Sequence, residues 1–180
     1  MNFCVSEIRY KIRDTITVMP KLILFYRERD AYGYYSNFYK AKIIIGGITY
    51  FCNEQYIMYQ KALLFNDRDI AQEILRTTNQ ATIKALGRRV KNFKEEIWVS
   101  QREAIADNCN YAKFTQHADL QKYLLETGDA ILAEATVHDR IWGIGCDAET
   151  GKDQSKWNGL NILGQSLMRV RQRIRQVSSS

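Results

Sequence analysis

The chain has 180 residues, of which 46% are hydrophobic, and it carries a formal net charge of +6 at pH 7. This length predicts one well-buried domain, and a single proline with ten glycines excludes a low-complexity chain. No run approaches the roughly 18 apolar residues of a membrane span, and Arg9, Lys11 and Arg13 interrupt the apolar stretch that a signal peptide would need.

The predicted elements begin with an irregular lead-in over residues 1–20, followed by a short apolar strand over Leu22–Tyr26. A β-hairpin is predicted over Lys42–Phe51, where two isoleucine-containing runs flank Gly46-Gly47. Two consecutive glycines supply the positive φ angles that a tight hairpin turn needs. Asn53 stands directly after the second of these strands, where a helix N-cap is expected.

Helical periodicity dominates the chain after the hairpin. Asp67 is the predicted N-cap of the second helix. The expected helices cover about 53–64, 67–77, 79–90, 94–108, 120–127 and 163–176. Residues 129–135 fit a short helix and a strand equally well. Residues 177–180 are predicted to form a disordered tail.

This order of elements predicts an α+β fold: a single helix-rich domain around a small β-sheet or hairpin, spanning residues 21–176. The chain shows no internal repeat and no linker that would divide it. Its four cysteines, Cys4, Cys52, Cys109 and Cys146, lie far apart and lack the paired spacing of a metal site. Without a secretion signal they are interpreted as reduced thiols of a cytoplasmic protein.

Basic residues cluster at 88–91 and again at 169–175. A basic surface attracts phosphate, whether in a nucleotide or along a nucleic-acid backbone. The C-terminal cluster can also be a solvated helix face whose cations meet the negative end of the helix dipole. Both interpretations stay open from the sequence.

A glycine-rich segment near residue 140 combines Asp139 with Trp142, Gly143 and Gly145. Trp142 offers a flat apolar face on which a ring can stack, and the glycines allow backbone to approach a ligand closely. Asn161 stands in a second glycine-rich run shortly downstream. Together these residues predict a pocket for a planar, polar small molecule.

Two further segments carry candidate binding or catalytic groups. Ser36, Asn37 and Phe38 belong to a tyrosine-rich loop that can present amide, hydroxyl and ring contacts to a ligand, although an ordinary connection anchored in the core would look the same. Glu54 opens the first helix, and Lys61 follows two turns later on about the same face. The helix dipole favours an ionised Glu54 and burial opposes it. A solvated helix face would also explain both residues.

A set of short motifs runs along most of the chain. These motifs are Phe25-Tyr26, Asp30-x-Tyr32-Gly33, Ser36-Asn37-Phe38, Glu54-x-Tyr56, Gln60-Lys61, Lys113-Phe114, Leu124-Leu125, Asp139-x-x-Trp142-Gly143-x-Gly145, Asn161-x-Leu163-Gly164 and Leu167-Met168-x-x-Arg171. Their order and spacing, over about residues 22–175, resemble the NADAR (YbiA-like) family of N-glycosidases. The chain differs from residues common in that family at Gln55 and Met58, and it carries an insertion at 148–157.

The resemblance implies hydrolysis of an N-glycosidic bond between a ribose carbon and a nitrogen base or amine. The implied small-molecule substrate is ADP-ribosyl-guanine, in a nucleotide or in nucleic acid, or a phosphorylated ribosylaminouracil intermediate of riboflavin biosynthesis. By this resemblance Glu54 acts as base or cation stabiliser, Asp139 orients the ribose or assists proton transfer, and Lys61 binds phosphate or forms an imine. The expected substrate contacts are Ser36, Asn37, Phe38, Trp142, Gly143, Gly145 and Asn161. No metal or other cofactor is expected.

Two other functions stay open from the sequence. A non-catalytic module would bind ADP-ribose or a nucleotide without turnover. A basic nucleic-acid-binding protein without a small-molecule site would depend on Arg169, Arg171 and Arg173, and its binding would fall steeply with salt.

Overall fold

The structure, a computed structural model, describes residues 9–12, 15–18 and 21–178. Strands β1 (Arg9–Ile12) and β2 (Thr15–Val18) form an antiparallel pair. The structure differs here from the expected irregular lead-in, because the β-branched run from Thr15 to Val18 favours extended backbone. The other residues of that lead-in lie outside the described residues.

The strand pairing places β3 (Leu22–Phe25) parallel to β6 (Ile131–Glu134), with Phe25 opposite Glu134. The segment that fitted a helix and a strand equally well is therefore a strand. The predicted hairpin is confirmed as β4 (Ile43–Ile45) and β5 (Ile48–Tyr50), joined by two glycines with φ of 59° and 78°. The strands form three two-stranded pairs in the described residues rather than one small sheet.

The described residues form six α-helices: α1 (Asn53–Leu64), α2 (Arg68–Leu75), α3 (Gln80–Arg88), α4 (Glu95–Gln116), α5 (Ala118–Glu126) and α6 (Ile162–Ser178). Short 3-10 turns lie at Gly33–Tyr35 (η1), Thr150–Lys152 (η2) and Gln154–Lys156 (η3). The N-cap predicted at Asp67 is confirmed, since its side chain accepts a hydrogen bond from the backbone N–H of Ile70.

Three helix boundaries differ from the expectation. Helix α4 continues eight residues beyond Asn108, because Ala112 and Phe114 keep burying an apolar face. Helix α6 includes residues 177 and 178 of the expected tail, while 179 and 180 lie outside the described residues. Asn53 is the first helical residue rather than the N-cap, which is Cys52.

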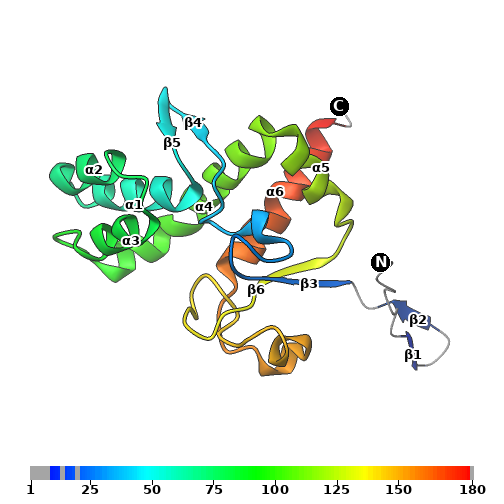
Figure 1. The fold of residues 1–180 in the computed structure, drawn as a ribbon. Helices are drawn as coiled ribbons and strands as arrows, with labels where there is room; N and C mark the ends of the chain where they lie inside the picture. The colour runs from blue at the N-terminus through cyan, green and yellow to red at the C-terminus, as the bar shows by residue number, and fades with distance from the viewer. Residues whose placement is uncertain (1–8, 13–14, 19–20, 179–180) are drawn as a thin grey trace.

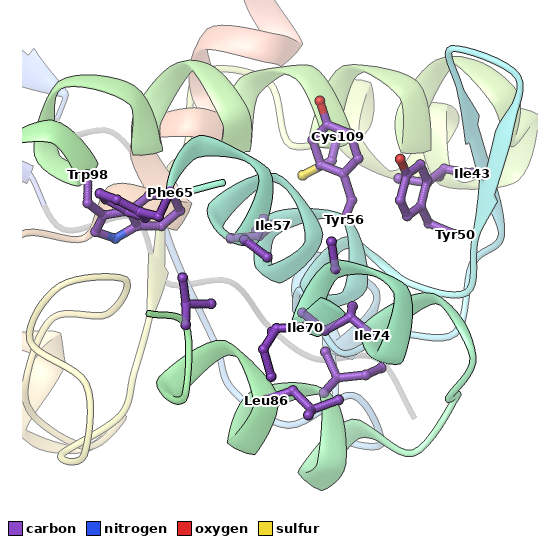
Figure 2. Close-up of a cluster of buried hydrophobic side chains, with 14 of the residues drawn as sticks. Ile43, Tyr50, Tyr56, Ile57, Phe65, Ile70, Ile74, Leu86, Trp98 and Cys109 are labelled. Carbon is purple, nitrogen blue, oxygen red and sulfur yellow. The ribbon is translucent and has the colours of Figure 1, made fainter. Parts of the chain in front are cut away.

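Helices α1, α2 and α3 lie on one side of α4 and helix α6 on the other (Figure 1). A hydrophobic cluster is found on each side of α4. The first packs α1, α2, α3 and the β4–β5 hairpin together, and Figure 2 shows Ile57, Ile70 and Leu86 between the three helices. The second packs β3 and β6 against α5 and α6. Trp142 contacts both clusters, so the loop that follows β6 lies at their junction.

A buried chain of polar side chains connects the helices across this junction. Asn53 of α1 donates to Asn110 of α4 at 2.7 Å, and Asn110 donates to Ser166 of α6 at 2.9 Å. Paired buried amides specify one relative position of the helices, because leaving any member unpaired is costly. The start of α1 is thereby held against the α4–α6 pair.

None of the described helices combines the length and the apolar character that crossing a membrane requires.

Candidate active site

A cavity of about 460 Å³ lies where the two clusters meet. Its wall is built by the loop after β3, by α1 and α3, and by the segment that ends β6 and leads to Trp142. This volume falls within the range of about 300–1,000 Å³ that is usual for ligand pockets. Because β3 and β6 are parallel, their carboxyl ends open at the same edge, where ligands commonly bind in α/β folds.

Glu54 lies in the first turn of α1 and lines the cavity. Its side chain is 7% exposed, and its backbone N–H donates to the carbonyl of Asn37 at 2.9 Å. The pKa of Glu54 is raised to about 7: burial is the main cause and Asp139 adds to the rise, while Lys84, Arg88 and Lys61 oppose it. A carboxyl group with this pKa can exchange a proton near neutral pH, which suits acid–base chemistry.

Asp139 lines the cavity from the loop after β6. One carboxyl oxygen, Oδ1, accepts hydrogen bonds from the backbone N–H groups of Ile141 and Trp142 at 2.9 and 2.8 Å. These two bonds fix the orientation of the carboxyl group. Within the described chain no hydrogen bond engages Oδ2, so that oxygen can accept from a ligand.

Three cations line the same cavity as the carboxyl groups. Lys61 of α1 is half-buried, which lowers its pKa, and it donates to the carbonyl of Gly87 at 3.0 Å. Lys84 and Arg88 lie one turn apart on α3 and also line the cavity. The Nζ of Lys84 lies 5.6 Å from the ring centroid of Phe38. The cavity thus combines carboxyl groups with cations that can hold a phosphate.

Ser36, Asn37 and Phe38 line the cavity beside Glu54. The loop is held from both sides: Lys113 donates to the Ser36 carbonyl at 3.0 Å, and Gln80 donates to the Phe38 carbonyl. Asn37 is 5% exposed, and its Oδ1 has no hydrogen-bond partner. An unpaired buried acceptor on a cavity wall is suited to a donor of a ligand.

Three expected substrate contacts do not line this cavity. A Cβ on Gly143 would lie 2.8 Å from the carbonyl oxygen of Glu134, and Gly145 has a φ of 74° with its face packed against Asn158. Asn161 bonds to β6 on both sides, accepting from Glu134 N–H at 3.2 Å and donating to the Leu132 carbonyl at 3.0 Å. Gly143 and Asn161 thus pack against β6 and Gly145 packs against Asn158, so the role of these three residues as substrate contacts stays a prediction.

Of the positions that differ from the family pattern, one lines the cavity and the others do not. Met58 lines the cavity. Gln55 does not, because its amide accepts from Phe51 N–H and donates to the carbonyls of Ile74 and Thr77. The insertion at 148–157 folds into η2 and η3 and contributes no residue to the cavity wall.

Glu134 and Lys84 are among the charged residues of the cavity that the sequence analysis did not single out. Glu134 is the last residue of β6, and its position would have stood out once 129–135 had been assigned as a strand parallel to β3. Lys84 precedes Arg88 by four residues, a spacing that places both on one face of a helix. That spacing was visible, but nothing showed that this face meets a cavity.

The C-terminal basic cluster is occupied by contacts within the protein. Arg169 bonds Asp107 through two nitrogens at 2.8 and 2.9 Å, and Arg171 is buried and donates to Thr127. Arg173 lies 4.0 Å from the ring centroid of Tyr111. These contacts favour the helix-face interpretation over a phosphate-binding surface.

Lys113 is fully buried beneath the loop that carries Asn37, and burial lowers its pKa from 10.5 to about 7. Between these values the unfolded chain binds more protons than the folded one, so this residue costs stability below about pH 7 and less as the pH rises. We expect Lys113→Met to gain stability relative to the wild type as the pH falls from about 10 to about 7.

Denaturant unfolding at several pH values measures this difference. Lys122→Met is the matched control, because Lys122 is exposed on α5 with only a surface ion pair to Glu126. Equal pH dependence in the Lys113→Met protein and the wild type would show that Lys113 keeps an ordinary pKa.

The fold and cavity together define the class: an α+β protein with a cavity that is lined by both carboxyl groups and cations. A model of the NADAR domain matches residues 24–175, and the chain belongs to this family. The resemblance inferred from its motifs is thereby confirmed.

Curated relatives and a solved structure agree with this assignment. The chain is 43% identical over 129 residues to an N-glycosidase of Acanthamoeba polyphaga mimivirus, covering 71% of this chain and 76% of that protein. It matches the NMR structure of Escherichia coli YbiA with a TM-score of 0.76 and 33% identity, over 91% and 90% of the two chains. A riboflavin biosynthesis protein of Vibrio vulnificus is 30% identical over 176 residues, which cover 98% of this chain and 44% of that protein.

Proposed function

We propose that the protein is an N-glycosidase that hydrolyses the C1′–N bond of an N-ribosyl substrate in this cavity. The observation that carries the proposal is that one cavity is lined by the carboxyl groups of Glu54 and Asp139 together with the cations Lys61, Lys84 and Arg88. Relatives named N-glycosidases support the bond type.

Breaking a C1′–N bond builds positive charge on the ribose, which a nearby carboxylate stabilises. Ionised Glu54 is the group for this role, because its pKa of about 7 leaves it partly ionised at neutral pH and able to take a proton from water. Asp139 orients the ribose through Oδ2, since its other oxygen is held by backbone amides. Trp142 supplies an apolar face for the base.

The cations of the cavity indicate that the substrate carries phosphate. Lys84 and Arg88 project from adjacent turns of α3 and can bind phosphate together, while Lys61 retains donors beyond its bond to Gly87. We therefore favour an electrostatic role for Lys61 over a covalent role in which it forms an imine with a ring-opened sugar. ADP-ribosyl-guanine and a phosphorylated ribosylaminouracil both carry such phosphates, and the name of the Vibrio vulnificus relative supports the second.

Product analysis by mass spectrometry tests the function. Purified protein is incubated, with and without EDTA, with guanine-ADP-ribosylated nucleotide or DNA and with ribosylaminouracil phosphate. Release of ADP-ribose or of the sugar phosphate with EDTA present is the expected result, and the preferred substrate selects between the two classes. Tight binding of one substrate without cleavage would instead support the non-catalytic ADP-ribose or nucleotide-binding module.

Asn37 provides a separate test of substrate contact. Removing its unpaired acceptor with Asn37→Ala is expected to raise KM by about 5- to 10-fold, the value of one neutral hydrogen bond. Stability is expected to be unchanged or slightly higher, because a buried oxygen without a partner is lost. Steady-state kinetics and thermal unfolding measure the two effects. A loss of stability with unchanged KM would make Asn37 a structural residue.

A further inference from the structure

The mechanism above leaves one carboxyl group of the cavity without a role. Glu134 ends β6 and lines the cavity with Glu54 and Asp139. Its backbone is fixed on both sides: the N–H donates to Asn161 Oδ1 at 3.2 Å, and the carbonyl accepts from Ile144 N–H at 2.9 Å. In the described part of the chain, no hydrogen bond or ion pair engages its half-buried carboxyl group. The side chain is therefore available to a ligand.

The charges around Glu134 favour its protonated form. Burial is the largest cause, Asp139 and Glu54 add repulsion, and only Lys84 opposes them, so that the pKa of Glu134 rises to about 8. Glu54 has three cations nearby and a pKa of about 7. The other titratable groups on the cavity wall are Tyr26, Arg27, Glu28, Lys61, Arg88 and His138. The surroundings thus favour a protonated Glu134 beside a Glu54 that ionises more readily.

We propose that Glu134 is the general acid of the reaction and protonates the departing nitrogen as the C1′–N bond breaks. This inference rests on the N-glycosidase function proposed above. A nitrogen base is a poor leaving group unless it receives a proton, and neither other carboxyl group is as well suited to donate one. Asp139 has one oxygen bound by two backbone amides, and Glu54 faces more cations than Glu134 does.

The step balances in protons and electrons. The electron pair of the C1′–N bond moves to the nitrogen, which takes the proton of Glu134. Water attacks C1′ and gives its proton to Glu54. The products are the free sugar and the neutral base or amine, which now carries an N–H, and transfer of a proton from Glu54 to Glu134 through solvent restores the starting state.

A comparison of leaving groups tests this role. Glu134→Gln is expected to lower kcat/KM by about 10²- to 10⁴-fold for the N-ribosyl substrate. For a 4-nitrophenyl ribofuranoside, whose leaving group departs without a proton, the loss is expected to stay below about 10-fold. The control is Glu73→Gln, which replaces an exposed carboxyl group of α2. Equal losses on both substrates would make Glu134 a structural residue.

The pH profile for the N-ribosyl substrate gives a second kinetic test. Wild-type kcat/KM for this substrate is expected to fall on the alkaline side, as Glu134 loses its proton near pH 8, and Glu134→Gln is expected to lack this alkaline limb. An alkaline limb that persists in the variant would assign it to another group and overturn the inference.

Infrared spectroscopy gives a reading that needs no turnover. The wild type is expected to show a protonated-carboxyl C=O band below about pH 8 that Glu134→Gln lacks. Absence of this difference would overturn the role of Glu134 even if the protein is active. If the band is present but the wild type cleaves no N-ribosyl compound, the proposed function fails and the acid role fails with it.

Discussion

Replacing Glu54 by glutamine is expected to lower kcat/KM by about 10³-fold or more while leaving substrate binding nearly intact. Glutamine keeps the size of the side chain but can neither stabilise a cationic ribose with a full charge nor accept a proton from water. Product release is measured by mass spectrometry, and substrate binding by calorimetry. An active Glu54→Gln protein would remove Glu54 from the reaction.

The same substitution is expected to stabilise the fold. The pKa of Glu54 rises from 4.5 to about 7 on folding, so the folded state binds more protons than the unfolded chain between these values. Wild-type stability therefore falls through this window as the pH rises, and the cost is full above about pH 7. Glu54→Gln removes that cost and is expected to gain roughly 1–3 kcal/mol above pH 7 but little near pH 4.

Thermal unfolding at these two pH values checks the sign. Glu73→Gln, on the exposed face of α2, is the matched control and is expected to show little effect at either pH. Lost activity together with raised stability would mark a carboxylate kept for function at a cost to the fold. Lost activity together with lost stability would instead assign Glu54 a structural role.

The position of Glu54 could be predicted because local signals agreed there. A strand-forming run ends at Phe51, helical spacing begins two residues later, and Glu54 falls in the first turn of α1. The segment that holds Asp139 and Trp142 could also be identified from the sequence, since an acid, an indole and glycines stand close together in the chain. Elements defined by short-range patterns thus placed most of the helices and both hairpin strands correctly.

The role of Glu134 could not be predicted from the sequence, because it depends on strand pairing between residues more than one hundred positions apart. Residues 131–134 have no period of their own that separates strand from helix, and only the parallel register with β3 makes them a strand. The cavity edge follows from that register. A tertiary contact, rather than any local property of Glu134, places its carboxyl group beside Glu54.

Gly143 and Gly145 were noticed in the sequence, but what lies against them could not be predicted from it. A glycine indicates that something approaches the backbone closely, but the sequence does not say whether that neighbour is a ligand or the protein itself. For Gly143 the neighbours are Thr136 and the carbonyl of Glu134, and for Gly145 the neighbour is Asn158. These close contacts fold the loop so that Asp139 and Trp142 face the cavity, which is an indirect contribution to the site.

Gly164→Ala is expected to be the most damaging substitution for stability. Gly164 lies in the first turn of α6, and a Cβ there would stand 2.0 Å from the carbonyl oxygen of Leu132 in β6. The same Cβ would lie 2.5 and 2.6 Å from the amide atoms of Asn161. Because backbone cannot rotate away as a side chain can, α6 must move off β6, at an expected cost of about 3 kcal/mol or more.

This displacement is expected to reach the site as well. Asn161 bonds to Leu132 and Glu134, so moving it releases the end of β6 that lines the cavity. Gly164→Ala should therefore lose activity at temperatures where it is still folded, as measured by kinetics beside a thermal unfolding curve.

Gly87→Ala is the matched control, since Gly87 is also a buried helical glycine. Its Cβ would meet the side-chain sulfur of Met58 at 2.0 Å rather than backbone. A flexible methionine can turn aside, and alanine favours the helix by about 1 kcal/mol over glycine, so the net loss is expected to stay below about 1 kcal/mol. Equal destabilisation of the two variants would show that the α6–β6 contact can relax, and that Gly164 is not required for close packing.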